Sequence, residues 1–173
     1  MYEKSDNLKE KEIEWQRKLE ELGEVGDALG EGIDERIKET VAAFNLAGFH
    51  TDSSCEGHLD WGTGAPWIGV EAAGEPEERF TGEKEVVEKI AKKAQNMLNE
   101  FYKDRNMSAD SKLAIEGVGG GGVFRIHNGG EDYEVMLKNM PETQKNGLAE
   151  RLQKHQAEMR AFGEFLKDKF FNS

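Results

Sequence analysis

The sequence predicts a mixed α/β protein of the α+β type, with one small mixed sheet of about four strands packed by about four helices. Three observations predict this fold. Apolar residues recur at helical spacing in long charged segments, they alternate in a few short segments, and glycine or proline separates the two kinds of segment. The predicted order is α-α-β-β-α-β-β-α, and helices layered against one sheet would bury the apolar sides of both.

A length of 173 residues is typical of one domain and is sufficient for a hydrophobic core. Residues 1–30 are predicted to form a charged N-terminal helical extension of this single domain. In it, Trp15, Leu19 and Leu22 give a narrow apolar stripe at helical spacing. The glycines between positions 23 and 32 then predict a break before the next helix.

Three further segments have the apolar period of a helix. The first covers 34–47 and ends at Gly48, a residue suited to a left-handed C-terminal cap. The second, over 83–105, has the clearest apolar stripe of the chain. The last begins at Pro141, reaches about position 170 and carries a histidine on its apolar side. A short helix is also expected at 131–139.

Short β-prone or alternating segments predict strands at 49–51, 67–71, 112–118 and 123–127. The last two flank the glycines at 119–122, which predicts a hairpin. The letters Gly117-x-Gly119-x-x-Gly122 match a dinucleotide-binding fingerprint, but that fingerprint requires a helix after the glycines and a strand is predicted here. If helices cover one face of the sheet, the other face carries Glu71, Glu116, Arg125 and His127.

The net charge of −12 argues against several classes of function. Bulk nucleic-acid binding relies on a basic patch, and no run of Lys and Arg forms one. No apolar stretch approaches the roughly 20 residues of a membrane span. Cys55 is the only cysteine, so no intrachain disulfide can form, which is typical of a reducing compartment. We therefore expect a cytoplasmic protein whose partner is a small-molecule ligand, with a single modified nucleotide still allowed.

The segment Thr51–His58, with the letters Thr-Asp-Ser-Ser-Cys-Glu-Gly-His, is the strongest candidate for a functional site. Together with His50 it contains two of the four histidines and the only cysteine of the chain. It is predicted as a loop between a helix and a strand. Loops held on a rigid scaffold are where binding and catalytic residues concentrate.

The loop and its surroundings resemble two groups of proteins. Residues 33–71 resemble small bacterial and phage proteins with a Thr-x-x-Ser-Cys-x-Gly-His loop, a group that brings no known function. The loop is also distantly similar to the Ser-Ser-Cys-Ser-Gly loop of the wybutosine-synthesis tRNA methyltransferase family. That second similarity is carried by Ser53, Ser54, Cys55 and Gly57. Glu56 and His58 stand where that family has Ser and Arg, and the similarity implies methyl transfer to tRNA.

One hypothesis from the residues is a zinc-type metal site formed by His50, Cys55 and His58. A tight turn can close the spacing Cys-x2-His on zinc. Three protein ligands and a water are the pattern of a catalytic zinc site, whereas a fourth protein ligand, such as His127, would make the site structural.

As an enzyme, such a protein would be metal-dependent and hydrolytic. Glu56 is then the leading candidate for the general base, with Asp52 and Asp60 as alternatives. Arg125 and His127 would support the metal ligands or contact the substrate.

Three alternatives use the same loop differently. Cys55 would be a nucleophile if His58, His127 or His50 activated it, with the amides around Gly57 holding an anion. The second alternative is a non-enzymatic module for a small anionic ligand or a partner protein. Its ligand-binding residues would be Ser53, Ser54, Gly57, Arg125 and His127. In the third, the loop is an ordinary turn and Cys55 is a small buried side chain.

Two aromatic residues next to the loop also have two interpretations. Trp61 and Trp67 flank a glycine-rich turn and would wall a ligand pocket beside His58 or only pack the loop, and packing is favoured because aromatic side chains bury a large area. His155, on the apolar stripe of the last helix, is predicted to lie at the edge of the core.

Overall fold

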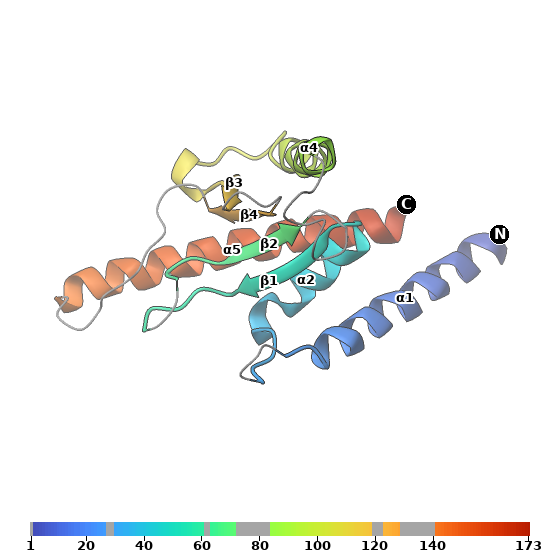
Figure 1. Cartoon of the computed structure of the whole chain (residues 1–173), viewed down its shortest axis with the longest axis horizontal. Coiled ribbons are helices and arrows are strands. Elements are labelled where there is room, and N and C mark those ends of the chain that lie inside the picture. The colour runs from blue at the N-terminus through green and yellow to red at the C-terminus, as the bar shows by residue number, and fades with distance from the viewer. Residues whose placement is uncertain (1, 27–29, 61–62, 72–83, 119–122, 129–140) are drawn as a thin grey trace.

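The computed structural model describes residues 2–26, 30–60, 63–71, 84–118, 123–128 and 141–173. Within these ranges the helices are α1 (Tyr2–Gly23), α2 (Glu35–Leu46), α4 (Lys84–Phe101), α5 (Glu142–Asn172) and the short 3-10 helix η1 (Ala109–Ser111). The strands are β1 (His50–Cys55), β2 (Trp67–Glu71), β3 (Leu113–Val118) and β4 (Val123–Asn128). The predicted fold class and order of elements are confirmed (Figure 1). The helix expected at 131–139 and the glycines at 119–122 lie outside the described residues.

The four strands form one antiparallel sheet in the order β1-β2-β4-β3. Residues paired directly across antiparallel strands point to the same face, so the register defines two faces. One face carries the buried residues Ile68, Val70, Phe124 and Ile126. The opposite face carries Glu71, Glu116, Arg125 and His127, as the alternation in the sequence predicts. Val123 begins a strand rather than a helix, so the glycine motif before it lacks the helix of a dinucleotide site.

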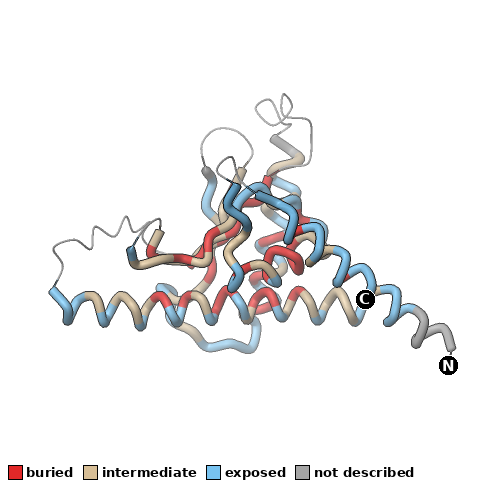
Figure 2. The backbone as a smooth tube through the Cα atoms, turned by 90° about the horizontal axis from the view of Figure 1, so that it is seen from below, coloured by how far each residue is buried: buried red, intermediate tan, exposed pale blue. Residues whose placement is uncertain are grey.

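The helices and the apolar face of the sheet share one hydrophobic core. Figure 2 shows that the buried residues gather around the middle of α5, which packs against α2. Phe162 of α5 contacts Phe44 of α2 and Phe101 of α4, with ring centroids 5.5 and 5.2 Å apart. From α1, Trp15 and Leu22 are buried in this core. Among the described residues, no helix has both the length and the apolar character needed to span a membrane.

The end of α2 determines where β1 begins. Gly48 has a φ of 78°, the left-handed conformation predicted for the cap of this helix. The N–H of Phe49 donates to the carbonyl of Phe44 at 3.0 Å, and the strand starts at the next residue. β1 is longer than predicted because its backbone pairs with β2 as far as Cys55, so only the last part of the segment Thr51–His58 is a turn.

Candidate metal centre

The turn that follows β1 is held in place by a glycine and by α5. Gly57 has a φ of 84°, and a Cβ built on it would lie 2.7 Å from Leu152 Cδ1 and 2.8 Å from the backbone of Ala65. The side-chain amide of Gln156 donates to the carbonyls of Glu56 and Gly57 at 3.0 and 3.3 Å. The turn therefore has a single close-packed position that only glycine allows.

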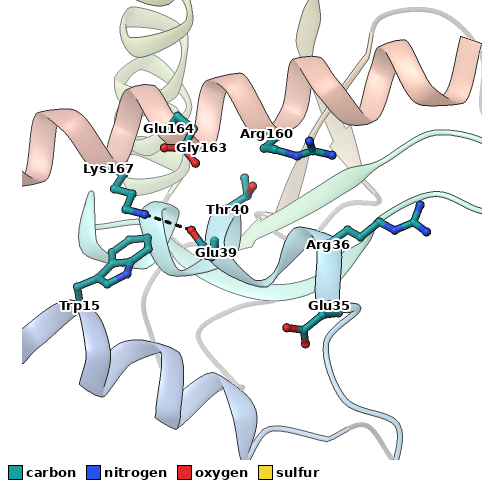
Figure 3. A pocket seen from close by; sticks show the side chains of 9 residues that line it. All are labelled: Trp15, Glu35, Arg36, Glu39, Thr40, Arg160, Gly163, Glu164 and Lys167. Carbon is teal, nitrogen blue, oxygen red and sulfur yellow. Dashed lines mark hydrogen bonds and ion pairs between the residues drawn. The ribbon is translucent and has the colours of Figure 1, made fainter.

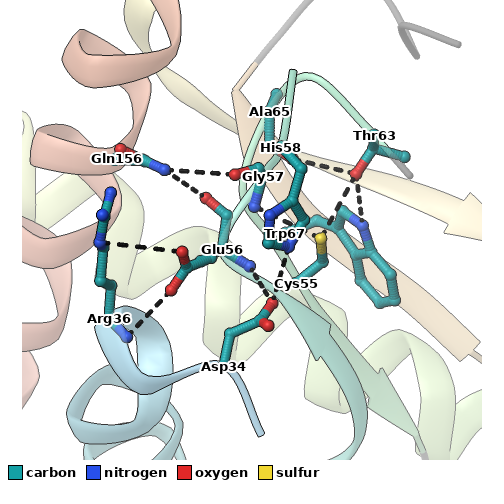
Figure 4. Close-up of polar contacts among 10 residues, drawn as sticks. All are labelled: Asp34, Arg36, Cys55, Glu56, Gly57, His58, Thr63, Ala65, Trp67 and Gln156. Carbon is teal, nitrogen blue, oxygen red and sulfur yellow. Dashed lines mark hydrogen bonds and ion pairs between the residues drawn. The ribbon is translucent and has the colours of Figure 1, made fainter. Parts of the chain in front are cut away.

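Three side chains with metal-binding atoms meet at this turn (Figure 4). Asp34 precedes α2, Cys55 ends β1 and His58 ends the turn. One carboxylate oxygen, the thiol sulfur and one ring nitrogen all lie within 4.8 Å of one another. Cys55 is buried, and the side chains of His58 and Asp34 are 15% and 24% exposed. The group is thus shielded from solvent without being closed to it.

Neighbouring groups orient the three donors. Asp34 Oδ2 accepts the peptide N–H of Glu56 at 2.9 Å and lies 3.3 Å from His58 Nε2. Cys55 Sγ accepts the N–H of Gly57 at 3.3 Å. Hydrogen bonds of this kind fix the direction in which metal ligands point.

The hydroxyl of Thr63 links the thiol to the sheet. Its Oγ1 lies 3.8 Å from Cys55 Sγ and accepts the indole N–H of Trp67 at 3.0 Å. Trp67 is also covered by the Arg125 guanidinium, 4.1 Å from the ring centroid. Trp67 therefore packs against the loop, and the Thr63 hydroxyl connects its indole N–H to the Cys55 thiol.

The donor set fits a zinc-type ion in chemistry and in spacing. Zinc is bound by Cys sulfur at about 2.3 Å and by His nitrogen or carboxylate oxygen at about 2.0–2.2 Å, in tetrahedral geometry. Two ligand atoms of such a tetrahedron are then about 3.3–3.8 Å apart. The separation of Asp34 Oδ2 and His58 Nε2 is 3.3 Å, and no pair of donors exceeds 4.8 Å. Small side-chain movements would complete the geometry.

The structure brings together two of the three predicted ligands, Cys55 and His58, and places His50 elsewhere. His50 and Cys55 stand at opposite ends of a six-residue strand, about 16 Å apart at roughly 3.3 Å per residue. At its own end, His50 Nδ1 lies 2.8 Å from Glu71 Oε1. The predicted set assumed a compact loop, whereas the extended backbone separates these two residues.

Asp34 is the group member that the sequence interpretation missed. It occupies the N-cap position of α2, where an Asp usually accepts a hydrogen bond from its own helix, yet its side chain makes no such bond. Its carboxylate reaches the turn after β1 instead. A contact between segments so far apart in the chain has no local sequence signal, apart from an aspartate just before a predicted helix.

The residues predicted as general base point away from the three donors or lie outside the group. The Glu56 carboxylate accepts the N–H of Arg36 at 3.0 Å and lies 3.8 Å from that residue's guanidinium, at the start of α2. Asp52 lies at a register shift of β1 and accepts a hydrogen bond from Ser53, and Asp60 is exposed. Glu56 therefore acts in the site through its peptide N–H rather than its carboxylate.

The predicted anion-binding residues are distributed over different surfaces. The N–H of Gly57 donates to Cys55 Sγ. Ser54 pairs with Ile68, on the face of the sheet that packs against the core. Ser53 and Arg125 are both opposite Gly69, on the other side. On that same side, His127 lies 3.0 Å from Glu116 and shares a row with Trp67 and Cys55.

The chain was compared with protein-family models, curated proteins and solved structures. No protein-family model, curated protein or solved structure matches the chain. The resemblance of residues 33–71 to small bacterial and phage proteins and the distant similarity of the loop to the wybutosine-synthesis tRNA methyltransferases remain predictions, so the proposed function rests on the geometry of the site.

Proposed function

We propose that Asp34, Cys55 and His58 bind one zinc-type divalent metal ion and that the protein is a small metal-dependent hydrolytic enzyme. The observation that supports this proposal is the convergence of an oxygen, a sulfur and a nitrogen donor within 4.8 Å. Cys55 and His58 are near neighbours in the chain, whereas Asp34 comes from the start of α2, so the meeting of all three depends on the tertiary fold. A thiol ligand must stay reduced, which agrees with a cytoplasmic setting.

Three donors meet among the described residues, and this number supports a catalytic role over a purely structural one. Structural zinc sites have four protein ligands, whereas catalytic sites have three and keep one position open. A metal ion here would supply Lewis acidity and lower the pKa of a coordinated water. The chain's own contribution is to orient the donors, through the N–H groups of Glu56 and Gly57, and to keep the thiol largely out of solvent.

The first experiment measures metal content by mass spectrometry on untagged protein purified without added metal or chelator. We expect about one ion per chain, and loss of that ion in Cys55→Ser, Asp34→Asn and His58→Gln. His50→Gln is the matched control, because it removes a histidine from the other end of β1, where the side chain is 58% exposed. Equal metal content in wild type and in the three ligand variants would refute the proposal.

The hydrolytic part needs a separate test. Protein with its metal would be screened against ester, amide and phosphoester substrates, before and after treatment with a chelator. We expect an activity that chelation abolishes, that added metal restores, and that His50→Gln retains. An activity that survives complete removal of the metal would contradict metal catalysis while leaving the metal site itself in place.

A second candidate function follows from the same three residues without a metal. His58 lies close to both the Asp34 carboxylate and the Cys55 thiol, and a histidine near a thiol and an acid is the set of groups that a cysteine nucleophile requires (Figure 4). This alternative predicts rapid alkylation of Cys55 by iodoacetamide near neutral pH in metal-free protein, slowed in His58→Gln. Slow alkylation in both forms would leave only the metal site.

A further inference from the structure

A second candidate site lies away from the metal donors, in a groove between α2 and α5. The groove has a volume of about 210 Å³ and is also lined by Trp15 of α1 (Figure 3). The two long walls meet at Thr40 and Gly163, where a Cβ built on the glycine would lie 2.7 Å from the threonine hydroxyl. The lack of a side chain at position 163 therefore lets the helices approach closely and form the bottom of the groove.

One end of the groove is aromatic and carries charges of both signs. The indole of Trp15 is buried and lies 4.4 Å from Lys167 Nζ. Lys167 also pairs with Glu39 at 3.2 Å, so these two charges neutralise each other. At this end the indole lies beneath the Lys167 ammonium, and Glu164 adds a further carboxylate to the lining.

The other end carries both arginines of the groove and is its basic end; Glu35 also lies there, and its carboxylate pairs with Lys38 at 3.0 Å. Arg160 lies seven residues before Lys167 on α5, about 10 Å along the helix axis at 1.5 Å per residue. Figure 3 shows its side chain on the same side as that of Arg36. Within the described part of the chain, the Arg160 guanidinium has no hydrogen bond or ion pair, although the chain carries 35 acidic residues. Arg36 is 67% exposed, and its one ion pair is long, at 3.8 Å.

A carboxylate of the protein already lies at this basic end. A smaller cavity shares Arg36, Thr40 and Arg160 with the groove and extends to Glu56. Glu56 is the partner of Arg36 in the long ion pair. An external anion at the two arginines would therefore compete with an internal one, which gives the site a testable signature.

We propose that this groove binds a small organic anion, with a carboxylate or phosphate group at Arg36 and Arg160 and a flat apolar group towards Trp15. Two guanidinium groups provide the planar, charged donors that such acid groups prefer. The volume lies below the range for drug-sized ligands, which fits a small metabolite. The site is separate from the metal donors and does not depend on the proposed enzyme activity.

The test uses phenyl phosphate and inorganic phosphate as probes on the full chain, followed by NMR of the three tryptophan indole N–H signals. Spectra of Trp61→Phe and Trp67→Phe assign the Trp15 signal. We expect saturable shifts of the Trp15 signal with phenyl phosphate, and affinity at least tenfold weaker for inorganic phosphate. No saturable Trp15 shift, or equal affinity for the two probes, would overturn the proposal.

Charge variants then distinguish specific binding in the groove from non-specific attraction of the anion to positive charge on the surface. Arg160→Gln should weaken phenyl phosphate binding about tenfold, whereas Lys154→Gln, an exposed charge on the same helix outside the groove, should not. Glu56→Gln should tighten binding several-fold by removing the internal competitor, and its control Glu150→Gln should leave affinity unchanged. If each variant and its control change affinity equally, the groove is not a specific anion site.

Discussion

The metal-donor group and a second group on α5 each contain a histidine and an acid, and they differ in what surrounds them. In the metal-donor group, Asp34 and His58 are partly exposed and their donor atoms face Cys55 across a turn. In the second group, Glu158 and His155 of α5 are each only 4% exposed. The first group has three donor atoms that converge, and a cation there is our proposal, whereas the second group already contains a cationic side chain.

That cation is Arg105, whose guanidinium lies 2.7 Å from Glu158 Oε2. Asn128 is also buried, and its side-chain amide donates to the carbonyl of Ser111 at 2.9 Å. Glu158 Oε1, His155 Nδ1 and Asn128 Oδ1 have no hydrogen-bond partner among the described residues. The Arg105 guanidinium neutralises the Glu158 carboxylate, so this group links α5 to the segment that follows α4.

The largest effect in this comparison is expected at the backbone of the turn. Gly57→Ala would place a Cβ against Leu152 in a left-handed conformation, so we expect a loss of about 2–5 kcal/mol in the free energy of unfolding. Gly147→Ala is the matched control in α5, because nothing lies within 4 Å of its added Cβ, and it should stabilise by about 0.5–1 kcal/mol. Urea unfolding of both variants measures the difference, and similar values would show that the turn adapts.

A smaller loss of stability is expected when the cation is removed from the second group. Arg105→Met leaves the buried Glu158 carboxylate without its charged partner and should cost about 1–3 kcal/mol at neutral pH. The double variant Arg105→Met, Glu158→Met should recover most of that loss, because no buried charge remains. Denaturation of the two single variants and the double variant tests this, and a purely additive loss would show that the pair is not coupled.

The smallest effect concerns pH. Burial lowers the pKa of His155 below its ordinary 6.5, and the positive charge of Arg151 lowers it further, against an opposing hydrogen bond to the Asp110 backbone. As pH falls, His155 is therefore protonated at a higher pH in the unfolded chain than in the folded protein. Its contribution lowers the free energy of unfolding below about pH 6.5. Urea unfolding at pH 7 and pH 5, with chelator present, should show a smaller pH-dependent loss in His155→Gln than in wild type. Identical pH slopes would argue against a neutral buried histidine.

The sequence was most informative where local patterns carry the signal. Apolar periodicity predicted the helices, the antiparallel hairpin and the buried position of His155, and Gly48 predicted the end of α2. The same local signals predicted strand rather than helix after the glycine motif at 117–122. These features depend on residues within a few positions of one another, which is the range over which periodicity and capping act.

The membership of the candidate site could be predicted only in part. Cys55 and His58 stand three positions apart in one turn, so their proximity follows from the sequence. His50 was misjudged as a neighbour because β1 continues to Cys55 by pairing with β2, and that pairing is a non-local interaction. An extended strand converts a short sequence separation into a long distance.

The sequence by itself thus determined the class of the fold, the elements and the turn that holds two donor atoms. Only the tertiary structure decided that Asp34 is the third donor, that Glu56 turns its carboxylate towards α2, and that Trp15 and Arg160 line one groove. The physical reason is that periodicity and capping act between near neighbours in the chain. Convergence of side chains instead requires that α2, β1 and α5 be packed against one another by the shared core.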